Sequence, residues 1–304
     1  MTMTDFYDLP VNPPAPDDAI MACYRAFAGH SPVTSGFCRQ CFDVEIERKI
    51  QRPPPLREKA WEDFSFIFHE HPECSVGADG YLHFLPRALE TAFFDDVIYP
   101  DLIGQAVKCG LYLLPEPEQA ALRRAGIRAA TGWFETGDPA PFGGLDPPCN
   151  SCGRSVMDSA WRSAEVGRKL MVALVHARVE PDQLFAWLAG IGTPQAWICL
   201  ADLINDDIIL DSPAYFVVSR GEEVLEETVE ALDRLARAAL FVEVSEDRLL
   251  EAALALTETH PEHAKRITNA ADIWSARRPT YSEADRVRDR DFVRDILTGD
   301  QVAL

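Results

Sequence analysis

The chain has 304 residues, of which 47% are hydrophobic, and it carries 49 acidic against 29 basic side chains, a formal net charge of −20. This length and apolar content suffice to bury a substantial core, and they exclude disorder over most of the chain. The acidic side chains are spread along the sequence, so we expect no binding to nucleic acid or to anionic membrane surfaces. A basic protein would instead be attracted.

The cellular compartment is inferred from what the sequence lacks. No apolar run reaches the ~18 residues of a membrane span, and the first residues, MTMTDFYDLPVNPPAPDD, have neither the basic nor the apolar region of a secretory signal. We therefore expect a cytoplasmic protein. In that setting its eight cysteines would be thiols or metal ligands rather than disulfides.

The first half of the chain has apolar residues at the three- and four-residue spacing of amphipathic helices. Residues 1–16 are predicted to form an extended, proline-rich lead-in. Gly77 to Gly80 is predicted as a turn. Because proline is tolerated in the first turn of a helix and not in its middle, Pro86 sets the start of the next helix near Leu85. The predicted helices cover residues 17–28, 42–51, 56–70, a segment from about 85, 101–114 and 116–136.

Residues 137–153, GDPAPFGGLDPPCNSCG, are too rich in glycine and proline for any regular element. They are the best domain boundary in the chain. We therefore predict an N-terminal helical domain over 17–136, a linker over 137–153, and a C-terminal helical domain over 154–304.

The second half reads as consecutive helices joined by short connections. Thr193 is a predicted N-cap before Pro194 at the first helical position, and residues 214–220 are the single strand-like run. No repeat of 30–50 residues is found. The fold class is therefore mainly α, an irregular multi-helix bundle or short helical solenoid of two packed domains, with the bundle favoured. The predicted helices cover residues 155–177, 181–189, 194–205, 222–240, 245–259, 261–277 and 282–297.

Two C-x-x-C motifs are the clearest chemical signal. Cys38 and Cys41 form the first, and Cys149 and Cys152 form the second. Two such turns supply the four thiolates of a tetrahedral structural zinc site. The separation of the motifs is much longer than in zinc ribbons, so a joint site requires the linker to fold back on the first domain. The alternative is that these cysteines are unmetallated thiols packed in loops.

Three other groups of residues offer weaker candidates. The string HEHPEC contains His69, His71 and Cys74, one of which can complete a metal site with the first C-x-x-C if the helix ends near Glu70. His83 lies between apolar residues and is interpreted as a packing residue. The string DLINDDIILD gives a candidate docking face for a basic partner, made of Asp202, Asp206, Asp207 and Asp211.

The first half resembles a family of bacterial helical proteins that has no assigned activity. The resemblance is carried by four strings over about 110 residues: YRAF at 24–27, CRQC at 38–41, PLRE at 55–58 and HFLPR at 83–87. It implies a compact helical domain that ends near Trp133. It implies no catalytic residue and no cofactor.

Two functions remain open from the sequence. No phosphate-binding loop, dinucleotide fingerprint, nucleophile elbow or kinase signature is found. The first function is an acidic protein that neutralises or scaffolds a basic partner, such as an immunity protein against a bacterial toxin. The alternative is a metal-dependent enzyme of unknown reaction, with Cys38, Cys41, Cys149 and Cys152 as structural zinc ligands.

Overall fold

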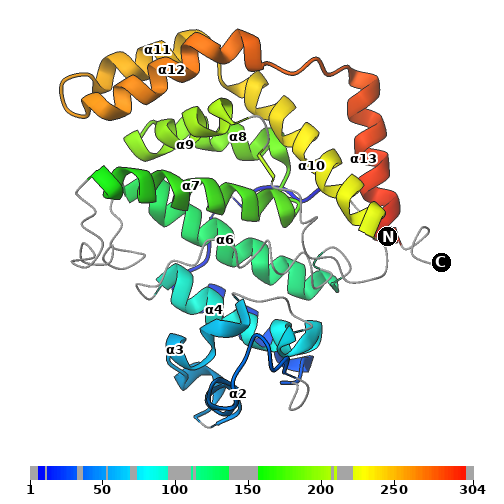
Figure 1. The fold of residues 1–304 in the computed structure, drawn as a ribbon. Coiled ribbons are helices and arrows are strands. Elements are labelled where there is room, and N and C mark those ends of the chain that lie inside the picture. Colours follow the sequence, from blue (N-terminus) through cyan, green and yellow to red (C-terminus); the bar gives the residue numbers. More distant parts are fainter. Residues whose placement is uncertain are drawn as a thin grey trace.

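The helices of this chain stack in layers (Figure 1). The computed structural model describes residues 6–10, 12–32, 37–52, 54–68, 74–94, 111, 114–136, 157–206, 209–210 and 222–298. Over these residues it contains twelve α-helices and no strand, which confirms the predicted mainly α fold and its packing as a helical bundle. None of the described helices is long and apolar enough to cross a membrane.

The described residues of the first half contain five α-helices and three short 3₁₀ turns. Helix α1 begins at Pro16 rather than at residue 17, and Asp43 caps α2 by accepting a hydrogen bond from the Ile46 amide at 2.8 Å. The predicted helix over 116–136 is confirmed. The α-helices are α1 (Pro16–Ala26), α2 (Val44–Gln51), α3 (Trp61–Phe64), α4 (Gly77–Phe94) and α6 (Glu116–Thr136), and the turns are η1 (Phe27–Gly29), η2 (Leu56–Glu58) and η3 (Ser65–Phe68).

The single helix predicted over 56–70 is wrong. The chain there is broken into η2, α3 and η3, with Lys59 in an extended conformation between the first two. Tertiary contacts outweigh the helical pattern at this point. The Lys59 ammonium reaches the carbonyl groups at the end of α2, and its own carbonyl accepts a hydrogen bond from Arg87 Nε at 2.9 Å. A continuous helix would remove both contacts.

The predicted turn at Gly77 to Gly80 and the helix start near Leu85 are also wrong. Helix α4 begins at Gly77, where φ is +72°, and Pro86 lies inside it. A proline inside a helix costs about 3 kcal/mol. Because Tyr81, Phe84 and Leu85 of the same helix are buried, and each such side chain contributes about 1.5–3 kcal/mol, core packing offsets that cost.

Over the part of the second half that the structure describes, seven helices follow one another, as predicted, with small differences at their ends. Thr193 is the N-cap of α9, accepting a hydrogen bond from the Ala196 amide at 3.4 Å. The strand-like run 214–220 lies outside the described residues. The helices are α7 (Met157–His176), α8 (Pro181–Ile191), α9 (Pro194–Asn205), α10 (Glu222–Glu243), α11 (Glu246–Leu256), α12 (Pro261–Arg277) and α13 (Glu283–Thr298).

One cluster of buried apolar side chains runs through both halves. Helices α6 and α7, which flank the predicted linker, pack against each other in the middle of the stack (Figure 1). Glycine permits the close approach, because a Cβ at Gly126 would lie 3.1 Å from Leu174 Cδ2, and one at Gly167 would lie 3.1 Å from Phe134 Cε1. The linker itself, 137–153, lies outside the described residues, so the domain boundary stays a prediction.

The lead-in before α1 is bound to the second half of the chain. Tyr7 forms a β-bridge with Val179, through hydrogen bonds from the Tyr7 amide to Arg178 O at 2.9 Å and from the Glu180 amide to Tyr7 O at 2.8 Å. The guanidinium carbon of Arg123, on α6, lies 3.4 Å from the centre of the Tyr7 ring. This short extended segment therefore ties α6 to the connection between α7 and α8.

Candidate metal centre

Three cysteines from two separate segments of the sequence meet beside the start of α4. The sulfur atoms of Cys38, Cys41 and Cys74 all lie within 4.8 Å of one another. Cys41 is exposed, and the other two are half-buried. The backbone holds the loops together, because the Cys38 amide donates a hydrogen bond to Cys74 O at 2.7 Å. This arrangement can hold a metal ion.

The local sequence explains the shape of the first loop. Phe37 and Phe42 flank the C-x-x-C motif, are both buried, and pack edge to face with ring centres 5.4 Å apart. Between these anchors the chain turns tightly, with the Cys41 and Phe42 amides donating to Cys38 O at 3.2 and 2.8 Å. The turn brings the two thiols to the same side.

The electrostatics of the cluster favour a cation. Backbone amides of Cys41 and Gln40 donate to the Cys38 sulfur and lower the pKa of that thiol. Loss of solvation and the sulfurs of Cys38 and Cys74 raise the pKa of Cys41 to about 12. Three thiolates this close repel one another, so all three ionise together only when a positive ion offsets the repulsion.

Two of the four predicted zinc ligands belong to a cysteine cluster that could hold a metal ion. The structure brings together Cys38 and Cys41, and adds Cys74, which the sequence offered as one alternative in the string HEHPEC. Cys149 and Cys152 lie outside the described residues, as do His69 and His71. Cys74 is not part of a C-x-x-C motif, so the spacing of cysteines in the sequence favoured Cys149 and Cys152 over it as metal ligands. The signal that finds it is the break in the helical pattern at Pro72.

The predicted acidic docking face is only partly described. Asp202 accepts from Arg266 Nη2 at 2.7 and 2.8 Å, and Asp206 pairs with Arg168 Nε at 2.9 Å. Burial raises the pKa of Asp202 in spite of the adjacent guanidinium. Both charges are thus offset within the fold. Asp207 and Asp211 lie outside the described residues.

Three of the strings that carry the family resemblance meet at one carboxylate. Glu90 Oε2 accepts from Tyr24 Oη at 2.7 Å and from Arg87 Nη1 at 2.7 Å, while Oε1 accepts from Arg57 Nε at 3.2 Å. Although burial opposes it, these hydrogen bonds lower the pKa of Glu90. Because every oxygen is engaged with groups of the fold, this cluster is interpreted as a tie between α1, η2 and α4.

Comparisons with known proteins provide no relative. No protein-family model, curated protein or solved structure matches the chain. The family resemblance of the first half therefore stays a prediction, and the function must rest on geometry and chemistry.

Proposed function

We propose that this chain is a zinc-binding helical protein in which Cys38, Cys41 and Cys74 hold a structural Zn²⁺. The observation that carries the proposal is the convergence of three sulfur atoms within 4.8 Å. Sulfur ligands suit Zn²⁺, which takes four donors in a tetrahedron in its structural sites. The ion would link the loop before α2 to the start of α4.

The fourth ligand is predicted from the sequence. His71 stands three residues before Cys74, the same spacing as within a C-x-x-C motif, and a histidine nitrogen binds Zn²⁺ as well as a thiolate does. Cys149 and Cys152 are the other candidates. A closed site of four protein ligands would have a structural role, because no position is left for water or substrate.

Metal content of point variants tests the proposal. The purified full-length chain should contain about one zinc ion per molecule, measured by inductively coupled plasma mass spectrometry. Cys38→Ser, Cys41→Ser and Cys74→Ser should each lose it, and His71→Ala, Cys149→Ser and Cys152→Ser identify the fourth ligand.

The matched control is Cys23→Ala, because Cys23 is buried in α1 and outside the cluster. This variant should keep its zinc even if it is less stable. A wild-type chain without zinc, or cluster variants that retain as much zinc as Cys23→Ala, would rule out the site.

We further propose that the chain docks a basic protein partner, with toxin neutralisation as its specific form. The support is the net charge of −20 together with an apolar stripe on α11. Leu250 and Leu254 are 42% and 77% exposed, four residues apart on one helix face. Exposed acids flank them: Glu246, Asp247 and Glu251.

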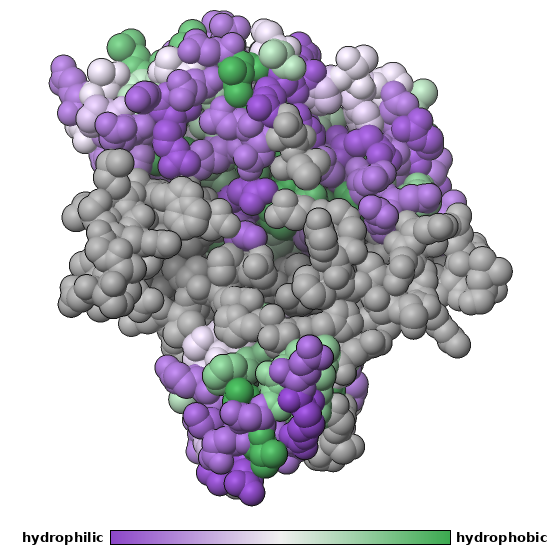
Figure 2. Space-filling view, in the orientation of Figure 1, coloured by the Kyte–Doolittle hydropathy of each residue, from purple (hydrophilic) through white to green (hydrophobic). Residues whose placement is uncertain are grey.

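The basic residue of α11, Arg248, points away from this stripe. Arg248 donates to Glu243 O at 2.7 Å and to Ala189 O at 2.9 Å, and its guanidinium carbon lies 5.4 Å from the Trp197 ring. Figure 2 shows hydrophobic side chains (green) among hydrophilic ones (purple) at the end of the molecule formed by α11 and α12. Because Asp202 and Asp206 are both held in ion pairs within the fold, we place the docking face on α11.

Substitution of the two leucines tests this second proposal. A basic protein that co-purifies with the tagged chain from its native host should bind the purified chain, and it should dissociate as salt is added. Leu250→Ser/Leu254→Ser should weaken that binding by about tenfold or more, since two apolar anchors are lost. Val287→Ser, at an exposed site on α13, is the matched control. Equal binding by both variants would exclude the α11 face.

A further inference from the structure

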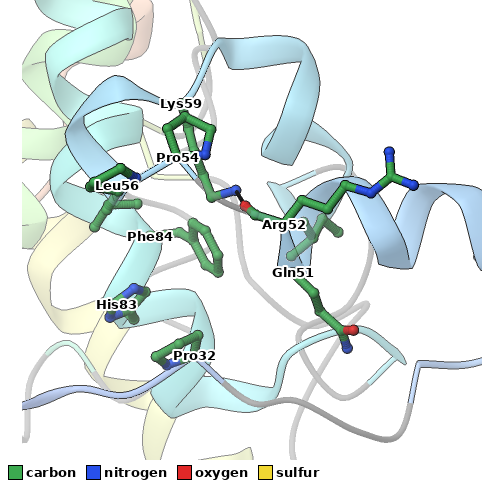
Figure 3. A pocket seen from close by; sticks show the side chains of 10 residues that line it. Pro32, Gln51, Arg52, Pro54, Leu56, Lys59, His83 and Phe84 are labelled. Atoms are coloured by element: carbon green, nitrogen blue, oxygen red, sulfur yellow. Dashed lines mark hydrogen bonds between the residues drawn. The ribbon is translucent and has the colours of Figure 1, made fainter.

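A cavity of about 440 Å³ lies between the end of α2, the proline-rich turn that follows it, and α4. Figure 3 shows its walls. This volume is within the range of small-molecule sites, which are lined mainly by apolar side chains and a few polar groups. The apolar lining consists of Pro32, Ile50, Pro54, Pro55, Leu56 and Phe84. Two strings that the sequence singles out, PLRE and HFLPR, therefore meet at this cavity.

The charge of the lining is opposite to that of the chain. In a protein of net charge −20, the residues that line this cavity include two bases, Arg52 and Lys59, and no acid. Figure 3 shows the Arg52 side chain extending away from Phe84, while the Lys59 side chain lies beside that ring. Lys59 is therefore the cation that a molecule in the cavity would meet.

The Lys59 ammonium is held in place by fewer hydrogen bonds than it can donate. The residue is only 5% exposed. Its ammonium group donates to Lys49 O at 3.4 Å and to Arg52 O, which leaves the third N–H without an acceptor among the described residues. Burial lowers the pKa of this amine. The Asp63 carboxylate opposes this shift, and an anion in the cavity would further offset the cost of burying the charge.

His83 supplies a second polar group, and its hydrogen-bond partner shows which ring nitrogen is the donor. Its Nδ1 lies 2.9 Å from the carbonyl oxygen of His30. Since a carbonyl only accepts hydrogen bonds, Nδ1 carries a proton, and Nε2 can accept a hydrogen bond when the ring is in its neutral form. The ring stands edge-on to Phe84, with centres 5.1 Å apart. The wall thus offers a donor, an acceptor and an aromatic face.

We infer that this cavity binds a small organic carboxylate with an apolar body. The carboxylate accepts a hydrogen bond from the Lys59 ammonium, and the body packs against Phe84 and the prolines. A hydroxyl or N–H on the ligand can donate to Nε2 of His83. The lining of this site does not include the three cysteines of the metal centre, so ligand binding can be tested independently of zinc binding.

Fluorine NMR of the full-length chain with 4-fluorobenzoate and with 4-fluorobenzamide tests the inference. The two probes have nearly the same shape and differ in charge. The wild-type chain should bind the acid about tenfold more tightly than the amide, because a hydrogen bond to a charged group is worth about 1.5 kcal/mol or more. Lys59→Met should remove that preference.

Two further variants separate the site from folding defects and from bulk charge. Lys265→Met makes the same change in net charge at an exposed position on α12, and it should bind both probes as the wild type does. Gln51→Trp adds bulk at an exposed residue of the lining and should weaken the binding of both probes. Equal affinity for acid and amide, no binding of either, or the same loss in Lys265→Met as in Lys59→Met would overturn the proposal.

Discussion

Removal of zinc by a chelator should lower the melting temperature of the purified chain by about 8 °C. A ligand held a thousandfold above its dissociation constant stabilises the folded state by about 4 kcal/mol, and each kcal/mol corresponds to about 2 °C for a chain of this size. The physical reason is that Cys38 and Cys41 come from one loop and Cys74 from another. Without the ion, the described residues of the two loops are held together by the amide-to-carbonyl hydrogen bond noted above, by hydrogen bonds among the thiols and by side-chain packing.

The measurement is differential scanning calorimetry with and without chelator, followed by return of the metal. Adding Zn²⁺ back in slight excess should restore the original melting temperature. In Cys74→Ser the chelator should have no effect, because the ion is already absent. A wild-type melting temperature that does not respond to the chelator, while zinc is shown to be removed, would mean that the ion does not stabilise this fold.

Asp289→Ala should destabilise the chain by about 2–3 kcal/mol, because a buried carboxylate that accepts charged hydrogen bonds is lost, while its partner Arg234 is 42% exposed and stays solvated. The Asp289 carboxylate, on α13, is 3% exposed. It accepts hydrogen bonds from Arg234 Nε and Nη2 at 2.8 and 2.9 Å, and from Tyr281 Oη at 2.9 Å. Because Arg234 belongs to α10, these bonds attach α13 to the rest of the bundle. Urea unfolding of both proteins at pH 7 measures the difference.

The Asp289 carboxylate also makes the free energy of unfolding depend on pH, with stability lost in acid. Hydrogen bonds from Arg234 and Tyr281 lower the pKa of Asp289 in spite of its burial. Since the folded-state pKa lies below the unfolded value of about 3.9, the contribution is fully present above that value and is lost as the pH falls below about 4. The difference between wild type and Asp289→Ala should therefore shrink in acid.

Asp291→Ala is the matched control for both measurements. Asp291 lies on the same helix, and its side chain is 47% exposed and pairs with Arg294 three residues away. Exposed pairs of this kind contribute less than about 1 kcal/mol. A loss in Asp289→Ala no larger than in Asp291→Ala, or a difference that persists in acid, would contradict the account of α13.

The helices were predictable wherever local signals agree with packing. Helix α9 begins where Thr193 and Pro194 place it, and α12 begins at Pro261, because an N-cap or a proline at the first position fixes a helix start without help from distant residues. Pro86 shows where local signals fail to predict the start of a helix. Its helix-breaking tendency is local, whereas the burial of its neighbours Tyr81 and Leu85 is a property of the whole core.

The candidate metal site was predictable in part for a related reason. The pair Cys38 and Cys41 is visible because a C-x-x-C turn is local. The approach of Cys74 depends on how η3 and α4 fold against that turn, which no spacing in the sequence records. The same reason applies to the cavity: Lys59 has no local sequence signal and His83 was interpreted as a packing residue, and only the fold brings them to the lining of one cavity.

Zinc-edge X-ray absorption of the purified chain tests the central claim most directly, since it reports which atoms surround the ion. The structure predicts at least three sulfur neighbours at about 2.3 Å. A spectrum that fits oxygen and nitrogen alone, at about 2.0–2.1 Å, would show that Cys38, Cys41 and Cys74 do not hold the metal.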